Sequence, residues 1–194
     1  MPDATELAAV SDIKTMLGIT SSGQDTLLAL IKAAIEQRVK KITGRDLLVP
    51  STPYTEYYNG DGGNVLRVDQ RPIISVTSIY SDPARNFGAE TLIPAADLIG
   101  DAKSYALGFV ELLTFRFLKG LKSTKITYSA GYSTVPADLS HAVRMIVCKE
   151  FKVIDKKMFA ETSQQVGDMQ ITLSPDKWPK DAMETIQAYR RIDF

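Results

Sequence analysis

The sequence predicts an α+β protein with a helical core of two long antiparallel helices plus short helices, an all-β insertion and a C-terminal strand-helix arm. Apolar residues recur at helical spacing before residue 49 and after residue 130, whereas β-branched residues, glycines and prolines dominate between them. A strand pattern and a short amphipathic helix follow the second helical stretch. The predicted parts are the helical core, 1–48 and 131–160, the β-rich insertion, 49–130, and the C-terminal arm, 161–194.

The composition indicates a globular protein without a global electrostatic field. Of its 194 residues 44% are hydrophobic, and 23 basic residues balance 23 acidic ones, so nothing draws the whole chain to nucleic acid or to an anionic membrane. Cys148 is the single cysteine, which excludes an internal disulfide and a cysteine-built metal site. Acidic residues near the N-terminus and charges within the longest apolar run lead us to expect neither a secretion signal nor a membrane span.

Helix signals frame the predicted core. A short helix is expected over Asp12–Leu17, with Ser11 as N-cap and Gly18 as its left-handed stop. A long helix should run from a Ser22 cap to Gly44. Val135-Pro136 opens the second long helix. The apolar stripes are Leu27, Leu28, Ile31, Ala34, Ile35, Val39 and Ile42 in the first long helix, and Leu139, Ala142, Val143, Ile146, Val147, Phe151 and Ile154 in the second.

Strand and turn signals fill the insertion. The clearest strand is Ile73–Tyr80, which is dense in β-branched residues. The glycine-rich segment 59–64 is long enough to close a hairpin between strands at 55–58 and 65–68. Further strands are expected at 90–93, 108–116 and 125–129.

No residue pattern predicts catalysis, a metal site or a cofactor. His141 is the only histidine, and a helix-surface position is its ordinary role. Asn59, Asp61 and Gly63 share some spacing with a calcium loop, but the glutamate required at its twelfth position is missing, so a turn is expected. The catalytic alternative is a small hydrolase or carbohydrate-active enzyme that uses Asp97, Asp101 or Glu111, with Asp97 and Asp101 as a candidate acid and base pair; turn carboxylates are the simpler interpretation. Cys148 is expected to be a core residue.

Basic residues form three local clusters. A solvated face is their ordinary explanation, and a surface facing DNA or a neighbouring subunit stays open because phosphate contacts need only local cations. The clusters are Arg38, Lys40, Lys41 and Arg45; Lys119, Lys122 and Lys125; and Lys152, Lys156 and Lys157.

The C-terminal arm carries the strongest interaction signal. Ala182, Ile186 and Tyr189 share one face of a short helix, Trp178 lies close to that face, and an arginine pair follows. A helix of about a dozen residues is marginal alone in water, so its apolar stripe must dock on something. Two possibilities stay open: the arm folds back on its own helical core, or it docks in a groove of another protein.

Four features in this order resemble the phage head-tail connector, or adaptor, proteins, which form a ring under the portal of tailed bacteriophages. They are the N-terminal helix pair with its Thr43-Gly44-Arg45 exit, the strand Pro72–Tyr80, the junction from Tyr128-Ser129-Ala130-Gly131-Tyr132 to Val135-Pro136, and the arm from Val166-Gly167-Asp168 to Ala188-Tyr189-Arg190-Arg191. Together they span most of the chain.

The resemblance implies a structural virion protein and no reaction. It implies a twelve-subunit ring that docks on the portal protein, continues the DNA channel with only non-specific DNA contact, and offers a site to a stopper or tail-completion protein. The β region is longer than in leaner members, and we expect it to lie on the outer or tail-facing side of the ring. The implied location is the head-tail interface of the virion, with the host cytoplasm during assembly. The implied portal-docking residues are Val166, Gly167, Asp168, Ile171, Trp178, Ile186, Tyr189, Arg190 and Arg191.

Other classes of protein stay open. A stopper or tail-terminator ring would equally lack catalytic groups, although two long helices around an insertion are not expected there. A helical DNA-binding regulator is disfavoured by the neutral charge and by the β region.

Overall fold

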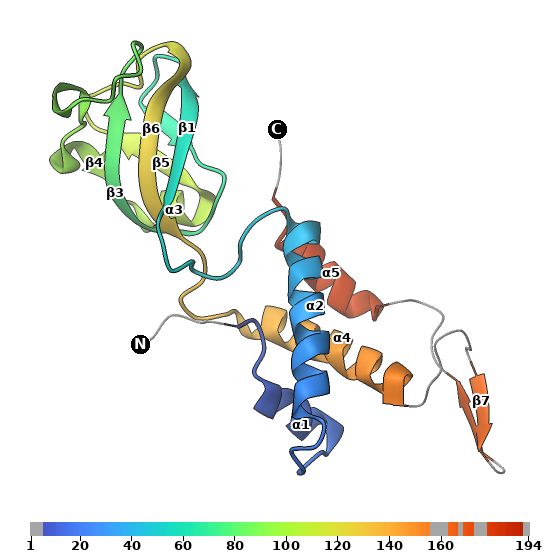
Figure 1. Ribbon diagram of the computed structural model, residues 1–194. Helices are drawn as coiled ribbons and strands as arrows, with labels where there is room; N and C mark the ends of the chain where they lie inside the picture. The colour runs from blue at the N-terminus through green and yellow to red at the C-terminus, as the bar shows by residue number, and fades with distance from the viewer. Residues whose placement is uncertain (1–5, 156–162, 167–168, 173–177, 192–194) are drawn as a thin grey trace. The chain divides into compact units, whose positions relative to one another are not determined.

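The computed structural model describes residues 6–155, 163–166, 169–172 and 178–191 (Figure 1). Their contacts group them into a β-rich unit, which spans Arg45–Thr134, and a helical unit formed by the segments before and after it. Helices and small antiparallel sheets together confirm the predicted α+β class. The described part of the C-terminal arm groups with the helical unit rather than standing apart from it.

The N-terminal helices end as predicted and begin differently. The helices are α1, Val10–Leu17, and α2, Asp25–Thr43, and the glycine after each one is left-handed, with φ of 70° at Gly18 and 68° at Gly44. The predicted serine caps are wrong, because Ser11 lies inside α1 and no side chain caps either helix. Ser22 instead begins a turn, in which the N–H of Asp25 donates to the backbone carbonyl of Ser22 (3.1 Å), and α2 begins at Asp25.

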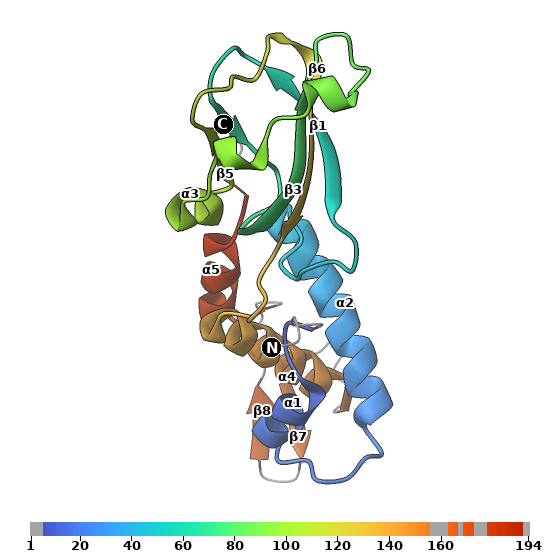
Figure 2. The same cartoon turned by 90° about the vertical axis from the view of Figure 1, so that its left-hand side faces the viewer.

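The second long helix, α4, is Ala137–Asp155. It contacts α1 and α2, and it crosses α2 rather than running antiparallel to it, which corrects the predicted arrangement (Figures 1 and 2). A short loop would enforce antiparallel neighbours, whereas here the whole β insertion joins the two helices, so ridge-and-groove packing is free to set the crossing. Its buried residues reproduce most of the predicted stripe: Leu139, Ala142, Val143, Ile146, Val147, Cys148 and Phe151.

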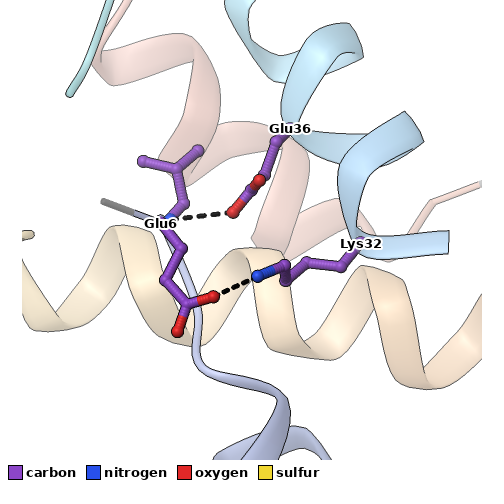
Figure 3. Close-up of polar contacts among 4 residues, drawn as sticks. Glu6, Lys32 and Glu36 are labelled. Atoms are coloured by element: carbon purple, nitrogen blue, oxygen red, sulfur yellow. Dashed lines mark hydrogen bonds and ion pairs between the residues drawn. The ribbon is translucent and has the colours of Figure 1, made fainter. Parts of the chain in front are cut away.

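A short N-terminal segment is fastened to α2 (Figure 3). The backbone N–H of Leu7 donates to Oε1 of Glu36 (2.8 Å), and Lys32 pairs with Glu6. Leu7 and Ala8 are buried beside this pair of contacts. Burial raises the pKa of Glu36 above its ordinary value of 4.5, and the Leu7 N–H offsets only part of that effect.

The β-rich unit consists of two small antiparallel sheets that share one core. In the first sheet the central strand is β6, Gly120–Ala130, with β1, Tyr54–Gly60, and β3, Ile73–Ser81, on either side (Figure 1). The second sheet has the order β2, Val65–Arg67, then β5, Phe109–Leu112, then β4, Leu98–Ile99. Residues of both sheets enclose the core: Leu66, Val68, Ile73, Ile79, Ile93, Val110, Leu112, Phe117, Ile126, Tyr128 and Ala130.

The predicted hairpin between 55–58 and 65–68 is wrong. Tyr54 of β1 pairs with Tyr128, and Val65 of β2 pairs with Glu111, so the segment between β1 and β2 connects two different sheets. Local turn signals cannot distinguish these pairings, because partners distant in sequence decide them. The predicted strand at 90–93 is largely a 3-10 turn, Ala89–Thr91, and the short helix α3, Ala102–Leu107, was not anticipated.

The β-rich unit closes where the chain enters and leaves it. The N–H of Tyr132 donates to the carbonyl of Leu47 (2.8 Å), and Leu48 forms a parallel bridge with Tyr132. Gly131, with φ of 125°, lets the entering and leaving segments of the chain lie close together. A Cβ at this position would lie 2.7 Å from the carbonyl carbon of Leu48. The insertion therefore has a defined base.

The C-terminal segment forms a hairpin and a helix. Strands β7, Ser163–Val166, and β8, Met169–Thr172, pair antiparallel, and α5 spans Lys180–Ala188. Within the described ranges, no helix is both long and apolar enough to cross a membrane.

Substitution of Glu36 tests the N-terminal fastening. Glu36→Ala leaves the buried N–H of Leu7 unpaired and should lower the free energy of unfolding by about 1 to 3 kcal/mol. Glu36→Gln keeps an acceptor oxygen and removes the cost of burying a charge, so it should be at least as stable as wild type at pH 7. Because the folded pKa is raised, the stability that protonation of Glu36 adds is full below 4.5 and is lost as pH rises through the folded pKa, while the hydrogen bond to Leu7 remains. Thermal unfolding between pH 4 and 8 measures this; a Glu36→Gln protein as unstable as Glu36→Ala would contradict it.

Candidate partner-binding surfaces

Helix α5 packs inside the helical unit. It contacts both α4 and α2, and Figure 1 shows it beside them. Ala182 and Ile186 are fully buried, and Trp178, which precedes the helix, is 6% exposed. The apolar stripe that the sequence marked as needing a partner is therefore covered by the chain's own helices, which is the back-folded arrangement that the sequence left open.

Polar contacts hold both ends of α5. At its start the guanidinium carbon of Arg38 lies 4.8 Å from the ring centroid of Trp178, a cation-π contact. Beyond its end the hydroxyl of Tyr189 donates to the carboxylate of Asp138 (2.8 and 2.9 Å to the two oxygens). The N–H of Arg191 donates to the carbonyl of Thr43 (2.7 Å), at the C-terminus of α2. These contacts hold α5 at both of its ends.

The predicted docking residues fall into four groups. Trp178 and Ile186 are buried, whereas Arg190 is exposed and Tyr189 and Arg191 are partly exposed. Val166 and Ile171 belong to the β7–β8 hairpin, where Val166 pairs with Met169 and Ile171 with Gln164. Gly167 and Asp168 lie outside the described residues. Binding of the portal by this set stays a prediction.

Asp97, one of the proposed hydrolase carboxylates, holds a turn. Its side chain is buried and accepts hydrogen bonds from the N–H groups of Thr114 (2.9 Å) and Phe115 (3.0 Å) and from the Thr114 hydroxyl. Burial alone would raise the pKa of Asp97, but these hydrogen bonds outweigh it and hold the pKa below its ordinary 3.8. The carboxylate therefore holds the backbone of the segment that follows β5.

The other two carboxylates have local structural roles. Asp101 caps α3 by accepting the N–H of Ser104 (3.0 Å), and the Ser104 hydroxyl donates to Glu111 (2.8 Å). All three carboxylates accept hydrogen bonds from their own unit, so the geometry gives the hydrolase alternative no support.

The remaining chemical candidates lie on α4 and in the segment between β1 and β2. His141 is exposed on α4, and Cys148 is buried, which raises the pKa of its thiol. The Asp61 carboxylate accepts the N–H of Gly63 (2.8 Å), as expected of a turn. Among the residues that the structure describes, no three His, Cys, Asp or Glu side chains are grouped to hold a metal ion.

Several basic side chains contact their own unit. Besides Arg38 on Trp178, Arg45 is buried and donates to the carbonyl of Arg71 (2.7 Å). Lys125 lies over the ring of Tyr80, with 5.5 Å from Nζ to the centroid. Three members of the predicted basic clusters therefore have structural contacts.

Sequence reasoning missed an exposed apolar surface in the β-rich unit. Leu113, Phe115, Leu118 and Leu121 are 63%, 47%, 48% and 70% exposed, although the segment reads as the end of one strand and the start of another. The available signal is a run in which large apolar residues alternate with cations and no acidic residue occurs between Glu111 and Asp138. Such a run suits neither a solvated loop nor a buried strand.

The chain belongs to the head completion protein family, whose model matches residues 6–192. This confirms the resemblance to phage head-tail connector proteins at the level of the family, which is a structural rather than an enzymatic one.

Solved structures show the same fold. A chain in the neck of an empty GTA particle computed with C6 symmetry is 18% identical and has a TM-score of 0.58, with 99% of this chain and 95% of that chain covered. A chain in the virion of a native gene transfer agent (GTA) particle is 18% identical with a TM-score of 0.55, covering 98% of this chain and 96% of that one. No curated protein matches the sequence.

The packing of α5 against α2 and α4 leads to a prediction about stability. Ile186→Ala should lower the free energy of unfolding by about 2 to 5 kcal/mol, because it removes a fully buried side chain and leaves a cavity against α2 and α4. The control Gln187→Ala changes an exposed residue of the same helix and should stay within about 0.5 kcal/mol. Denaturant unfolding measures both. Equal stability of the two variants would show that α5 is not seated in this way.

The hydrogen bonds of the Asp97 carboxylate lead to a prediction about how stability depends on pH. Asp97→Asn should lower Tm at pH 7, since an amide cannot replace a carboxylate that accepts three hydrogen bonds. Because the folded pKa is lowered, the wild-type stability from Asp97 is present above 3.8 and is lost as pH falls through the folded pKa. The Tm difference between the two proteins should therefore shrink in acid. A difference independent of pH would contradict this role of the carboxylate.

Proposed function

We propose that this protein is a head-tail adaptor, which forms a ring on the portal of a phage or phage-like particle. The ring continues the DNA channel and provides the attachment site for a stopper or tail-completion protein. Its place is the head-tail interface of the virion, after assembly in the host cytoplasm. Its action is assembly, with no reaction and no cofactor.

The observation that carries this proposal is the family membership over residues 6–192. The similarity in fold to a chain of a particle neck supports it, since nearly the whole of both chains is covered. The structure of that neck was computed with C6 symmetry. A ring of twelve subunits is compatible with this symmetry, because twelve is a multiple of six. The zero net charge is also consistent with a channel wall that must release DNA.

Two physical requirements follow for such a ring. A closed ring needs heterologous contacts, in which one surface of a subunit meets a different surface of the next. Many copies of a weak portal contact then act together, so one ring binds a symmetric portal far more tightly than one subunit does.

Portal binding is assigned to two parts of the C-terminal segment. Tyr189, Arg190 and Arg191 form the end of α5 that solvent can reach, and aromatic and arginine side chains are enriched at interface hot spots. The β7–β8 hairpin, with Val166 and Ile171, is the second part of the assigned contact. Trp178 and Ile186 contribute by seating α5 rather than by touching the portal in this conformation.

Electron microscopy of portal-bearing heads mixed with the purified protein tests the proposal. Rings on the portal vertex are expected from this protein alone. A stopper would instead need an adaptor ring already present, so failure to bind bare portals together with binding to adaptor-loaded heads would favour the stopper alternative.

Charge reversal at Arg190 tests the assigned contact. Arg190→Glu should weaken binding to portal-bearing heads by about tenfold or more, because charge reversal removes an attraction across the interface and replaces it with a repulsion. Gln187→Glu is the matched control, since it places the same negative charge on an exposed position of α5. Co-sedimentation with heads measures binding, and thermal unfolding confirms that both variants fold. Equal binding by the two variants would exclude Arg190 from the contact.

A further inference from the structure

The β-rich unit has four large, exposed apolar side chains within residues 113–121, a segment that we call the docking loop. It comprises the β5–β6 connection and the first residues of β6. The side chains of Leu113, Phe115, Leu118 and Leu121 are between 47% and 70% exposed. Exposed apolar residues are ordinary when scattered singly, whereas four large ones in so short a segment indicate an interaction surface.

The backbone of the docking loop is held in place by the rest of the unit. Asp97 takes the N–H groups of Thr114 and Phe115. The N–H of Phe117 donates to the carbonyl of Gly63, and its carbonyl accepts the N–H of Gly62, both at 2.8 Å. The backbone of the loop is therefore held by hydrogen bonds at Thr114, Phe115 and Phe117, which lie among its exposed apolar residues.

The centre of the loop is equally fixed. Phe117 is fully buried, so it anchors the loop in the core while its neighbours point to solvent. The N–H of Leu118 donates to the hydroxyl of Ser81 (2.8 Å), and its carbonyl accepts the hydroxyl of Ser123 (2.7 Å). Gly60 makes room for this arrangement, since a Cβ at that position would lie 1.9 Å from the Leu118 carbonyl oxygen.

A loop fixed in this way is suited to binding. Association normally costs free energy to order the loop and its side chains, and a loop that is already ordered avoids most of that cost. The same hydrogen bonds contribute to folding whichever way the four side chains point. The exposure of those side chains is then a feature that folding alone does not require.

The charge of the docking loop indicates what would cover it. Arg116, Lys119 and Lys122 are exposed among the apolar residues, and no acidic residue lies between Glu111 and Asp138. An apolar surface rimmed by cations is complementary to an apolar recess rimmed by carboxylates.

We propose that the docking loop binds the next protein of the neck, through an apolar recess on that protein that is bordered by carboxylates. This assignment rests on the proposed adaptor function and names the surface that the function uses on its tail-facing side. Leu113, Phe115, Leu118 and Leu121 fill the recess, and Arg116 and Lys119 pair at its rim. Asp97 is a positioning residue, because it orients the loop and touches no partner.

Head-tail joining in an extract of the parent particle made without this chain tests the proposal. The extract supplies heads, tails and the other neck proteins, and the purified full-length chain is added back. Two quantities are measured: the chain bound to re-isolated heads, and the fraction of heads joined to tails. The variants are Leu113→Ser with Leu121→Ser, and Arg116→Glu with Lys119→Glu; the control is Leu107→Ser, which is 54% exposed in the same unit but on α3.

Both double variants should bind heads as wild type does and reduce joining by about tenfold or more, the expected loss when hot-spot contacts are removed. The control should join normally, and higher salt should reduce joining by the wild type more than joining by the Arg116→Glu, Lys119→Glu variant. Since all the substituted residues are exposed, the variants should unfold at the wild-type temperature, which thermal unfolding confirms.

Other occupants of the loop give different results, and each overturns the proposal. Normal joining by both double variants would show that the loop is not a docking surface. Loss of head binding would assign the loop to the portal, and wild-type self-association that the leucine variant abolishes would assign it to a second copy. Binding of the wild type, but not the leucine variant, to phosphatidylglycerol vesicles would assign it to a membrane surface. If the wild type itself fails to bind heads, the adaptor function and this assignment fail together, a result distinct from loss in the variants alone.

Discussion

Burial of the apolar face of α5 against α2 and α4 is the interaction on which the helical unit depends. The β-rich insertion separates α1 and α2 from the rest of this unit along the chain, so only tertiary packing can bring the parts together. Ile186 and Ala182 supply that packing without exposed area, and Arg38, Asp138 and the carbonyl of Thr43 hold the ends of α5. A helix that would be marginal alone thereby becomes part of a stable core.

This arrangement separates two roles that the sequence had merged in one segment. The buried residues of α5 stabilise the chain's own fold, while Tyr189, Arg190 and Arg191 remain at the accessible end. A short segment can hold both roles because a helix presents different residues on its different faces. In the proposed adaptor, the packing of α5 against α2 and α4 sets the direction of Tyr189, Arg190 and Arg191, which meet the portal.

In the β-rich unit, buried polar residues hold the backbone of a loop whose apolar side chains are exposed. The Asp97 carboxylate, which the sequence offered as a catalytic candidate, orients the backbone of the docking loop, and Ser81 and Ser123 orient its centre. Buried polar groups must be hydrogen-bonded, and here they fix a loop whose side chains are exposed. In this structural family, such groups help to set the shape of a surface.

The sequence by itself determined the α+β class, the helix ends at Gly18 and Gly44, the stripe of α4 and the strand β3, because periodicity and glycine chemistry are local properties. The order of its features also led to the family that the comparison confirmed. Only the tertiary structure decided the crossing of α2 and α4, the pairing of β1 with β6, the seat of α5 and the exposure of the docking loop. These depend on partners distant in sequence, and the apolar pattern of a segment does not say whether its own chain or another protein will cover it.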